Sequence, residues 1–242
     1  MTSQSTSPSR RAQQRRVQQA KRRRAVVVLL LLSAGFLGAR SLPHLSQLRP
    51  SLEKIQKTVW VSEPLPLAME GGDPYVRALM RTISAAESNT DDPYSVLYGG
   101  QVVPRLNRHP NICVEIVAGP NLGHCTTAAG RYQFLSGTWQ EKAANYHPKS
   151  SGWFGTWRDY SFDPVSQDLV VYRWLSDTSA WNLDIPTALR EGRLDEVLRR
   201  LSGTWTSLGY GIESNSMTAR LPRVYDSLLQ EELELAPPSQ LN

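Results

Sequence analysis

Glu87 is the side chain whose type and position in this sequence best suit acid–base chemistry. It follows Ile83 by four residues, and Met80, Leu79 and Val76 continue the same spacing toward the N-terminus. Residues three or four apart share one face of a helix, so Glu87 is expected to project from the apolar face of an amphipathic helix. An apolar environment raises the pKa of a carboxyl group, which suits a general acid at neutral pH. The alternative is a half-exposed glutamate at a fraying helix end.

The sequence has no recognisable metal site, phosphate-binding loop or nucleophile motif. Its four histidines, His44, His109, His124 and His147, are scattered, and no pair has the spacing of metal ligands. We therefore expect neither a metal nor another cofactor. The many tyrosines and tryptophans are more informative, because such rings stack on sugar faces when they line a groove. Most of them are expected in the core, where large aromatic side chains fill space.

A capped helix opens a mainly helical domain. Asp73 is typical of an N-cap and Pro74 of a first helical residue, so a helix is expected over residues 73–87. Further helices are predicted over residues 136–146, 163–176, 194–201 and 216–233, the last interrupted near Pro222. Short strands are predicted over residues 96–98, 101–103 and 114–117. The expected fold class is α+β, mainly α, over residues 71–236.

The positive charge of the chain is concentrated at its N-terminus. The formal net charge is +5, but residues 1–24 hold eight of the 27 lysines and arginines and no acidic residue. The other 19 basic residues are outnumbered by 22 acidic ones. A basic face for nucleic acid is therefore not expected on the folded part, and residues 1–24 are predicted to be a cytoplasmic tail.

An apolar segment follows this tail directly. Residues 25–39 contain no charge and would extend about 22 Å as a helix, against roughly 30 Å for the hydrocarbon core of a bilayer. Arg24 and Arg40 can lengthen such a segment by snorkelling. A cleaved signal peptide is the competing interpretation, but the basic region is long and the best cleavage site, Ser33-Ala34-Gly35, lies inside the apolar run. We expect an uncleaved transmembrane anchor over residues 25–42.

The positive-inside rule predicts the orientation of this anchor in the inner membrane. Residues after the anchor are expected on the periplasmic or cell-wall side. Proline-rich residues 43–70 predict a linker, and residues 237–242 predict a flexible tail. The two cysteines, Cys113 and Cys125, are expected to pair in an oxidising compartment, which would close a loop worth about 3 kcal/mol. Two unrelated free thiols are the alternative.

Six blocks occur in an order that resembles the lambda-type phage lysozymes (endolysins) and their bacterial relatives. The similarity covers about residues 72–235, and the Gly-Arg-Tyr-Gln and Ser-Gln-Asp blocks together are its most specific part. The blocks are Ala86-Glu87-Ser88-Asn89-Thr90, Tyr-Ser-Val-Leu-Tyr-Gly-Gly at residues 94–100, His109-Pro110, Ala-Gly-Arg-Tyr-Gln-Phe-Leu-Ser at residues 129–136, Phe-Asp-Pro-Val-Ser-Gln-Asp at residues 162–168, and Trp-Thr-Ser-Leu-Gly-Tyr-Gly at residues 205–211.

The resemblance implies a lysozyme-like fold whose cleft cuts the glycan strands of peptidoglycan. The family's members are lytic transglycosylases, which cleave the bond between N-acetylmuramic acid and N-acetylglucosamine without water and leave a 1,6-anhydro ring. Glu87 matches the family's single catalytic glutamate. Tyr98, Tyr132, Gln133 and Tyr210 fall in blocks expected to bind the glycan, and a place in the core is the alternative for Tyr132 and Tyr210.

One carboxylate is enough for this reaction, because the attacking hydroxyl belongs to the substrate. A hydrolytic muramidase, the nearest alternative, usually needs a second carboxylate. Asp91, Asp92 and Glu115 are the candidates for it, although the two aspartates also suit a solvated turn. A non-catalytic cell-wall-binding protein is the alternative from another class. A monomer is expected in each case.

Two positions depart from the pattern of the family. Ser88 follows the catalytic glutamate where many members have glycine. Arg105 and Arg108 occur in a loop where phage relatives tend to have aspartates, so a family role for acids in this loop does not carry over. The predicted disulfide lies just after this loop and is expected to stiffen one lip of the cleft.

Overall fold

The computed structural model describes residues 64–117, 121–148, 160–210 and 218–237. The predicted basic tail, the predicted anchor over residues 25–42 and most of the predicted linker lie outside these residues. Within the described residues, no helix is both long and apolar enough to cross a bilayer. The described residues thus comprise most of the domain predicted over residues 71–236 and the few residues before it.

Helices dominate the described domain, which confirms the prediction of a mainly helical α+β fold. The helices are α3 (Pro74–Glu87), α4 (Ser136–Tyr146), α5 (Pro164–Leu175), α6 (Thr178–Trp181), α7 (Ile185–Arg190), α8 (Leu194–Leu201) and α9 (Leu221–Leu235). Short 3-10 turns are η2 (Tyr98–Gly100), η3 (Thr206–Leu208) and η4 (Thr218–Arg220). The antiparallel sheet has two strands, β1 (Val114–Glu115) and β2 (Cys125–Thr126), with Val114 opposite Thr126.

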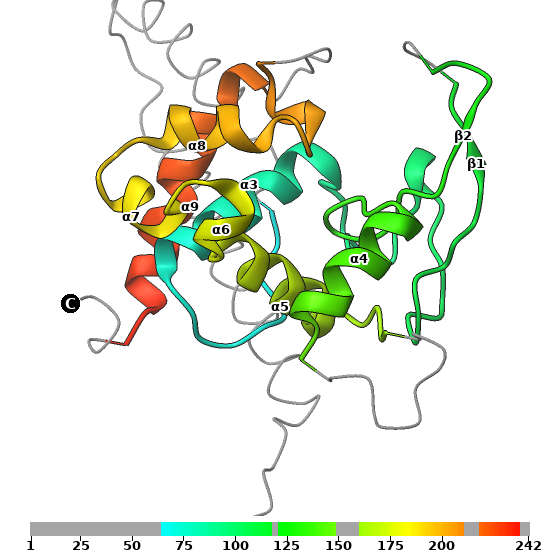
Figure 1. Ribbon diagram of the computed structural model, residues 1–242, viewed down its shortest axis with the longest axis horizontal. Coiled ribbons are helices and arrows are strands. Elements are labelled where there is room, and N and C mark those ends of the chain that lie inside the picture. The colour runs from blue at the N-terminus through cyan, green and yellow to red at the C-terminus, as the bar shows by residue number, and fades with distance from the viewer. Residues whose placement is uncertain (1–63, 118–120, 149–159, 211–217, 238–242) are drawn as a thin grey trace, which may run out of the picture. The chain divides into compact units, whose positions relative to one another are not determined.

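Helix α3 is the centre of this domain. It contacts α9, α5, α7 and η3. Figure 1 shows it in the middle of the helical part, and α4 and the β1–β2 hairpin lie on the right of the view. Its apolar residues Val76, Leu79, Met80 and Ile83 are completely buried. The neighbours on several sides explain why the helix is buried beyond its apolar stripe, including at Arg81.

Short local signals set the helix starts. The Asp73 carboxylate accepts a hydrogen bond from the Tyr75 N–H at 2.9 Å, and the Asp163 carboxylate accepts one from the Ser166 N–H at 2.9 Å. In both helices proline occupies the first turn, where no N–H is needed. The same rule corrects one prediction: Pro222 lies in the first turn of α9 and begins the helix rather than interrupting it.

The predicted strands are shorter in the structure than in the sequence pattern. Residues 96–98 and 101–103 pair with each other only through a bridge between Val96 and Val102, because Tyr98–Gly100 turns as a 3-10 helix between them, and Leu97 forms a bridge with Ala129. Only Val114–Glu115 of the third candidate is a strand. Gly99 has a φ of 80°, a conformation that glycine adopts without strain and that ends regular pairing.

Residues 64–70, at the end of the predicted linker, lie against the domain. Leu67 and Met69 are buried among its core residues. The Asp168 carboxylate accepts hydrogen bonds from the backbone N–H groups of Ala68, at 2.6 Å, and Met69, at 3.1 Å. Alternating apolar residues and one buried acceptor thus hold this segment in place without regular secondary structure.

Candidate active site

The C-terminus of α3 presents Glu87 at a half-buried position. The helix ends at the next residue, where the Ser88 N–H donates to the Ser84 carbonyl at 2.8 Å. Glu87 follows the buried Ile83 by four residues on the same face of α3, as the spacing predicts, but it is half-buried and not part of the core. Glu87 is therefore positioned by a helix that is itself packed on several sides.

Ser88 ties this helix end to a turn that follows it by 43 positions in the chain. The Ser88 hydroxyl is buried and donates to the Arg131 carbonyl at 2.6 Å. Its φ of −151° is negative, so the position does not require glycine. The departure from the glycine of many relatives thus supplies a hydrogen bond that glycine lacks.

Ser207 is a direct partner of Glu87, although the two residues are far apart in the sequence. Its hydroxyl donates a hydrogen bond to Oε1 of Glu87 across 120 positions of sequence. Two bonds hold the segment that carries Ser207: the Trp205 indole N–H donates to the Tyr132 carbonyl at 3.1 Å, and the Thr218 hydroxyl donates to the Ser207 carbonyl at 3.1 Å. These two hydrogen bonds therefore hold Ser207 in position to contact Glu87.

The turn over residues 128–134 holds both partners of this contact. Consecutive carbonyls, those of Arg131 and Tyr132, accept from the Ser88 hydroxyl and from the Trp205 indole. Gly130 has a φ of 74°, and a Cβ there would lie 2.7 Å from the Phe162 ring, so only glycine fits. The Gln167 side chain fixes the same turn by accepting from the Arg131 N–H at 2.9 Å.

A cluster of buried polar side chains packs against this turn and holds it in place. The Arg131 guanidinium donates to the Tyr94 hydroxyl at 2.9 Å and to the Pro66 carbonyl at 3.0 Å. The hydroxyls of Tyr94 and Tyr132 donate to the Asp168 carboxylate at 2.7 Å and 2.6 Å. Burial and the nearby Asp168 charge raise the pKa of both tyrosines, so both hydroxyls keep their protons and remain donors. The most specific sequence blocks thus form the support of the site.

The four residues predicted to bind the glycan differ in their exposure to solvent. Tyr132 is 1% exposed, which places it in the core, as its alternative interpretation had it. Gln133 is half-buried with a φ of 46°, and its amide donates to the Gly130 carbonyl at 3.0 Å. Tyr98 is half-buried, and its backbone N–H donates to the Ala128 carbonyl at 3.1 Å. Tyr210 is 46% exposed.

Tyr210 lies three residues after Ser207 and extends the site at the surface. Its hydroxyl donates to Asp195, and the Arg199 guanidinium lies 4.5 Å from the centre of its ring. The hydrogen bond to Asp195 is the main cause of a raised pKa for Tyr210. Two neighbours on α8 thus fix the orientation of an exposed aromatic ring beside the segment that contacts Glu87.

The candidates for a second carboxylate are exposed. Asp91 and Asp92 lie in the loop after α3, and Asp92 accepts a hydrogen bond from the Ser95 hydroxyl at 3.1 Å. Glu115 is on β1 and points to solvent. Within the described part of the chain, no cluster of three His, Cys, Asp or Glu side chains is arranged to hold a metal ion.

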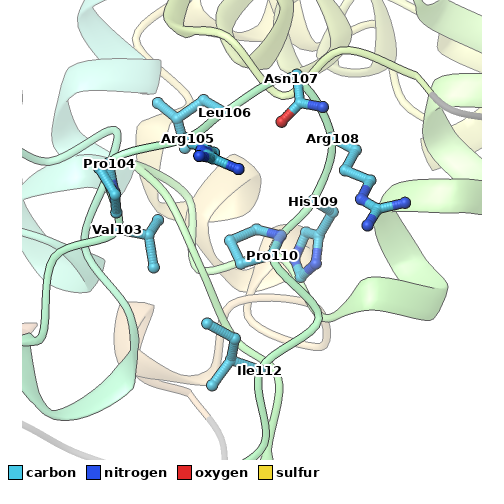
Figure 2. Close-up of a pocket in the computed structure, with 9 residues that line it drawn as sticks. All are labelled: Val103, Pro104, Arg105, Leu106, Asn107, Arg108, His109, Pro110 and Ile112. Carbon is cyan, nitrogen blue, oxygen red and sulfur yellow. The ribbon is translucent and has the colours of Figure 1, made fainter.

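The predicted disulfide is confirmed. Cys113 and Cys125 are bonded, with Cα atoms 5.5 Å apart, and they tie the start of the β1–β2 hairpin to its end. Just before the hairpin, residues 103–110 and Ile112 border an open hollow of about 570 Å³ (Figure 2). Glu87 is not among the residues that line it, so this hollow is distinct from the contact between Ser207 and Glu87.

Sequence reasoning missed three residues that position Glu87. Ser88, Trp205 and Ser207 all lie inside recognised blocks, but only the structure shows the hydrogen bonds that their side chains make. A serine carries no signal of its own, because its hydroxyl is equally common at caps, turns and surfaces. The only sequence signal for these three residues was that they lie inside two of the recognised blocks.

Comparisons with known proteins point to one family. The sequence model of the endolysin family matches residues 77–229, more than half of the chain. Two solved structures are similar to it: the lysozyme from bacteriophage lambda, at 21% identity, and bacteriophage lambda lysozyme complexed with a chitohexasaccharide, at 24% identity. Each match covers 69% of this chain and 96% of the other, with a TM-score of 0.45. No curated protein matches the sequence.

Proposed function

Because the chain belongs to the endolysin family, a family of peptidoglycan-cleaving, lysozyme-like enzymes, we propose that it is a lytic transglycosylase with Glu87 as its acid and base. The bond cleaved joins N-acetylmuramic acid to N-acetylglucosamine. The observation that carries this proposal is the hydrogen bond from Ser207 to Glu87, which fixes a half-buried carboxyl group at a helix end. A carboxyl group whose position is fixed by a hydrogen-bond donor is what a single acid–base residue requires.

The first step transfers a proton from Glu87 to the oxygen of the glycosidic bond. As that oxygen leaves with the N-acetylglucosamine unit, positive charge develops at the anomeric carbon of the muramic acid. Glu87 becomes a carboxylate in the same step, and the Ser207 hydroxyl donates to its Oε1. A donor of this kind favours the charged form and keeps the carboxylate in place.

The second step closes a ring within the sugar. The 6-hydroxyl of the muramic acid attacks the anomeric carbon and gives its proton to the Glu87 carboxylate, which restores the enzyme. Because the attacking hydroxyl is already part of the substrate, no water must be activated, and proximity supplies part of the rate. A second carboxylate has no role here, which agrees with the exposed positions of Asp91, Asp92 and Glu115.

The glycan would follow the surface beside the turn over residues 128–134. Tyr210 offers an exposed ring for a sugar face, and the half-buried Tyr98 and Gln133 offer polar groups at the same turn. Tyr132 would act from the core, since its carbonyl holds Trp205 and its hydroxyl is bonded to Asp168. The assignment thus separates three residues that can touch the glycan from one that supports them.

The N-terminal residues also bear on where in the cell the enzyme works. We infer that residues 25–42 anchor the enzyme in the inner membrane as a single helix, with residues 1–24 in the cytoplasm. The support is the sequence itself: an uncharged apolar run directly after eight basic residues. The catalytic domain would then face the periplasm or the cell wall, where its disulfide is stable.

The test is digestion of purified peptidoglycan by the full chain and by Glu87→Gln, with mass spectrometry of the soluble products. We expect muropeptides with 1,6-anhydro ends from the wild type and, at the sensitivity of the assay, none from Glu87→Gln. Glu234→Gln, which makes the same change at an exposed glutamate on α9, is the matched control and should behave as the wild type.

Two outcomes would change the assignment. Products with ordinary reducing ends would show hydrolysis, the muramidase alternative, and would direct attention to Asp92 as a second carboxylate. Firm binding of peptidoglycan without soluble products from either protein would leave only the cell-wall-binding alternative.

A further inference from the structure

The loop before the disulfide borders an open hollow that the proposed reaction does not use. Residues 103–110 and Ile112 line this open hollow (Figure 2), and its volume is about 570 Å³. The guanidinium of Arg105 and the amide of Asn107 point into the space between the two limbs of the loop, and Arg108 lies at its edge (Figure 2). A space of this size accepts a short peptide or a small ligand.

The lining carries positive charge and no negative charge. Arg105 and Arg108 are both exposed, and the lining contains no aspartate or glutamate. Among the described residues, neither arginine forms an ion pair, although several other arginines of the domain do. Two guanidinium groups without an acidic partner are a site for carboxylates or other anions, which arginine binds through two parallel hydrogen bonds.

Five of the other lining residues are apolar. They are Val103, Pro104, Leu106, Pro110 and Ile112, and Ile112 is 44% exposed. A ligand that fits this hollow therefore combines anionic groups with small apolar groups. A polyanion that carries only phosphates would leave the apolar surface uncovered, and an uncharged sugar would leave both arginines without a partner.

The hollow is held in shape by groups outside it. His109 is buried, and Nε2 of its ring lies 2.8 Å from the Phe134 carbonyl while Nδ1 accepts from the Asn111 N–H at 3.1 Å. Burial lowers the pKa of His109, so the neutral ring that can make both bonds persists at neutral pH. The Phe162 N–H donates to the Leu106 carbonyl at 2.9 Å, and the disulfide begins one residue after Ile112. A preformed site loses little entropy on binding.

Hydrogen bonds connect the hollow to the turn that supports Glu87. The Val103 N–H donates to the Ser95 carbonyl at 2.9 Å, and the Gly130 N–H donates to the Val96 carbonyl at 2.8 Å. Residues 95–97 therefore lie between the loop of the hollow and the turn over residues 128–134. The loop of the hollow is thus joined, through these residues, to the turn whose Arg131 carbonyl accepts from Ser88.

We propose that the hollow binds the stem peptide of peptidoglycan, with its carboxylates at Arg105 and Arg108 and its alanine methyl groups on the apolar lining. The inference rests on the proposed function, because it takes peptidoglycan as the substrate. Stem peptides branch from muramic acid and combine free carboxylates with alanine side chains, the two features that this lining matches. Asn107 adds a neutral donor between the two arginines.

The first experiment compares two substrates with the full chain: intact peptidoglycan, and glycan strands from which an amidase has removed the peptides. The double variant Arg105→Gln/Arg108→Gln should raise KM on intact peptidoglycan about tenfold, since a charged hydrogen bond contributes the equivalent of a factor of ten or more. Its kcat/KM on the stripped strands should equal that of the wild type. Arg223→Gln, an exposed arginine on α9, is the matched control.

A binding measurement separates this proposal from the proposed function. The probe is the free stem tetrapeptide, titrated by calorimetry against the full chain carrying Glu87→Gln, so that cleavage plays no part. We expect binding that the Arg105→Gln/Arg108→Gln change abolishes and Arg223→Gln leaves intact. If the tetrapeptide does not bind, or if inorganic phosphate displaces it at equal concentration, the stem-peptide site is overturned even where the enzyme cleaves glycan. Equal loss of kcat/KM on both glycan substrates would overturn it as well.

Discussion

Two neighbouring carbonyl groups bring together the residues that meet at Glu87. The Arg131 carbonyl receives the Ser88 hydroxyl, and the Tyr132 carbonyl receives the Trp205 indole. Because both acceptors belong to one turn, a shift of that turn moves Glu87 and Ser207 together. The hydrogen bond between them is therefore insensitive to small movements of the surrounding helices.

Replacing Ser207 by alanine should slow the reaction and change its pH dependence. Loss of the hydroxyl leaves the carboxyl group of Glu87 less well placed, which should lower kcat by about tenfold. Glu87 must start protonated, so activity falls as pH rises through its titration. Without the donor the charged form loses stabilisation, and this falling limb should move to higher pH by up to about one unit. A pH profile of kcat/KM measures both effects.

The conservative variant Ser207→Thr keeps the hydroxyl and provides the control. It should restore the position of the falling limb, even if its extra methyl group lowers the rate. A falling limb at the same pH in Ser207→Ala and the wild type would show that the serine packs beside Glu87 without acting on its protonation.

The place of Glu87 at the end of a helix was predictable, because one helix carries the signal. Glu87 is found from its spacing to Ile83, because both lie on one face of α3. Ser207 is not found in this way, since its contact crosses 120 positions and depends on how η3 packs on α3. Tyr132 looked like a ligand contact from its block, yet its hydroxyl serves the buried Asp168.

At the scale of elements, buried charges join α3 to α9. Arg81 and Glu232 are each 2% exposed, and Nη1 of the arginine lies 3.1 Å from Oε1 of the glutamate. Arg77, one turn earlier, donates to Oε2 of Glu232 at 2.6 Å, and the partly exposed Glu231 also pairs with Arg81, at 2.8 Å. The pairing fixes the rotation of α3 about its axis and hence the direction in which Glu87 leaves it.

Glu232→Gln should therefore destabilise the domain strongly. The change leaves Arg77 with a neutral partner and the buried Arg81 with the partly exposed Glu231 as its remaining acidic partner, and breaking such a pair costs about 3 kcal/mol. Urea unfolding followed by tryptophan fluorescence measures the loss as a lower midpoint at an unchanged slope. Glu234→Gln, which neutralises an exposed acid on the same helix, should change stability by less than about 0.5 kcal/mol. Equal midpoints for both variants would contradict a structural role for the buried pair.

Elements with strong local signals were predictable. The helices α4 and α8 have the predicted bounds, and α5 starts at the predicted Asp163-Pro164 cap. The short helices α6 and α7 were missed, because four and six residues are too few to show a helical period. The caps Asp177 and Asp184 were the available signal, since both accept hydrogen bonds from backbone N–H groups of the next turn.

At the scale of the whole molecule, location is the property that the N-terminal sequence predicts. The full chain should sediment with the membrane fraction, and a chain that lacks residues 1–42 should stay in the soluble fraction. An apolar helix flanked by arginines requires detergent for release, whereas attraction of basic residues to lipid head groups yields to high salt. Extraction of membranes with 1 M salt (on the order of a 3 Å screening length) and then with detergent distinguishes the two. Release by salt alone would contradict the anchor.

The long separation between Glu87 and Ser207 also bears on how the protein is made. A ribosome releases α3 early, but the segment that carries Ser207 and the helix α9 that pairs with α3 emerge last. A nascent chain, or a fragment produced by premature termination, thus carries the glutamate without the partner that orients it. The capacity to cut the cell wall would then arise only when synthesis of the domain is complete, so that incomplete copies pose no danger to the cell that makes them.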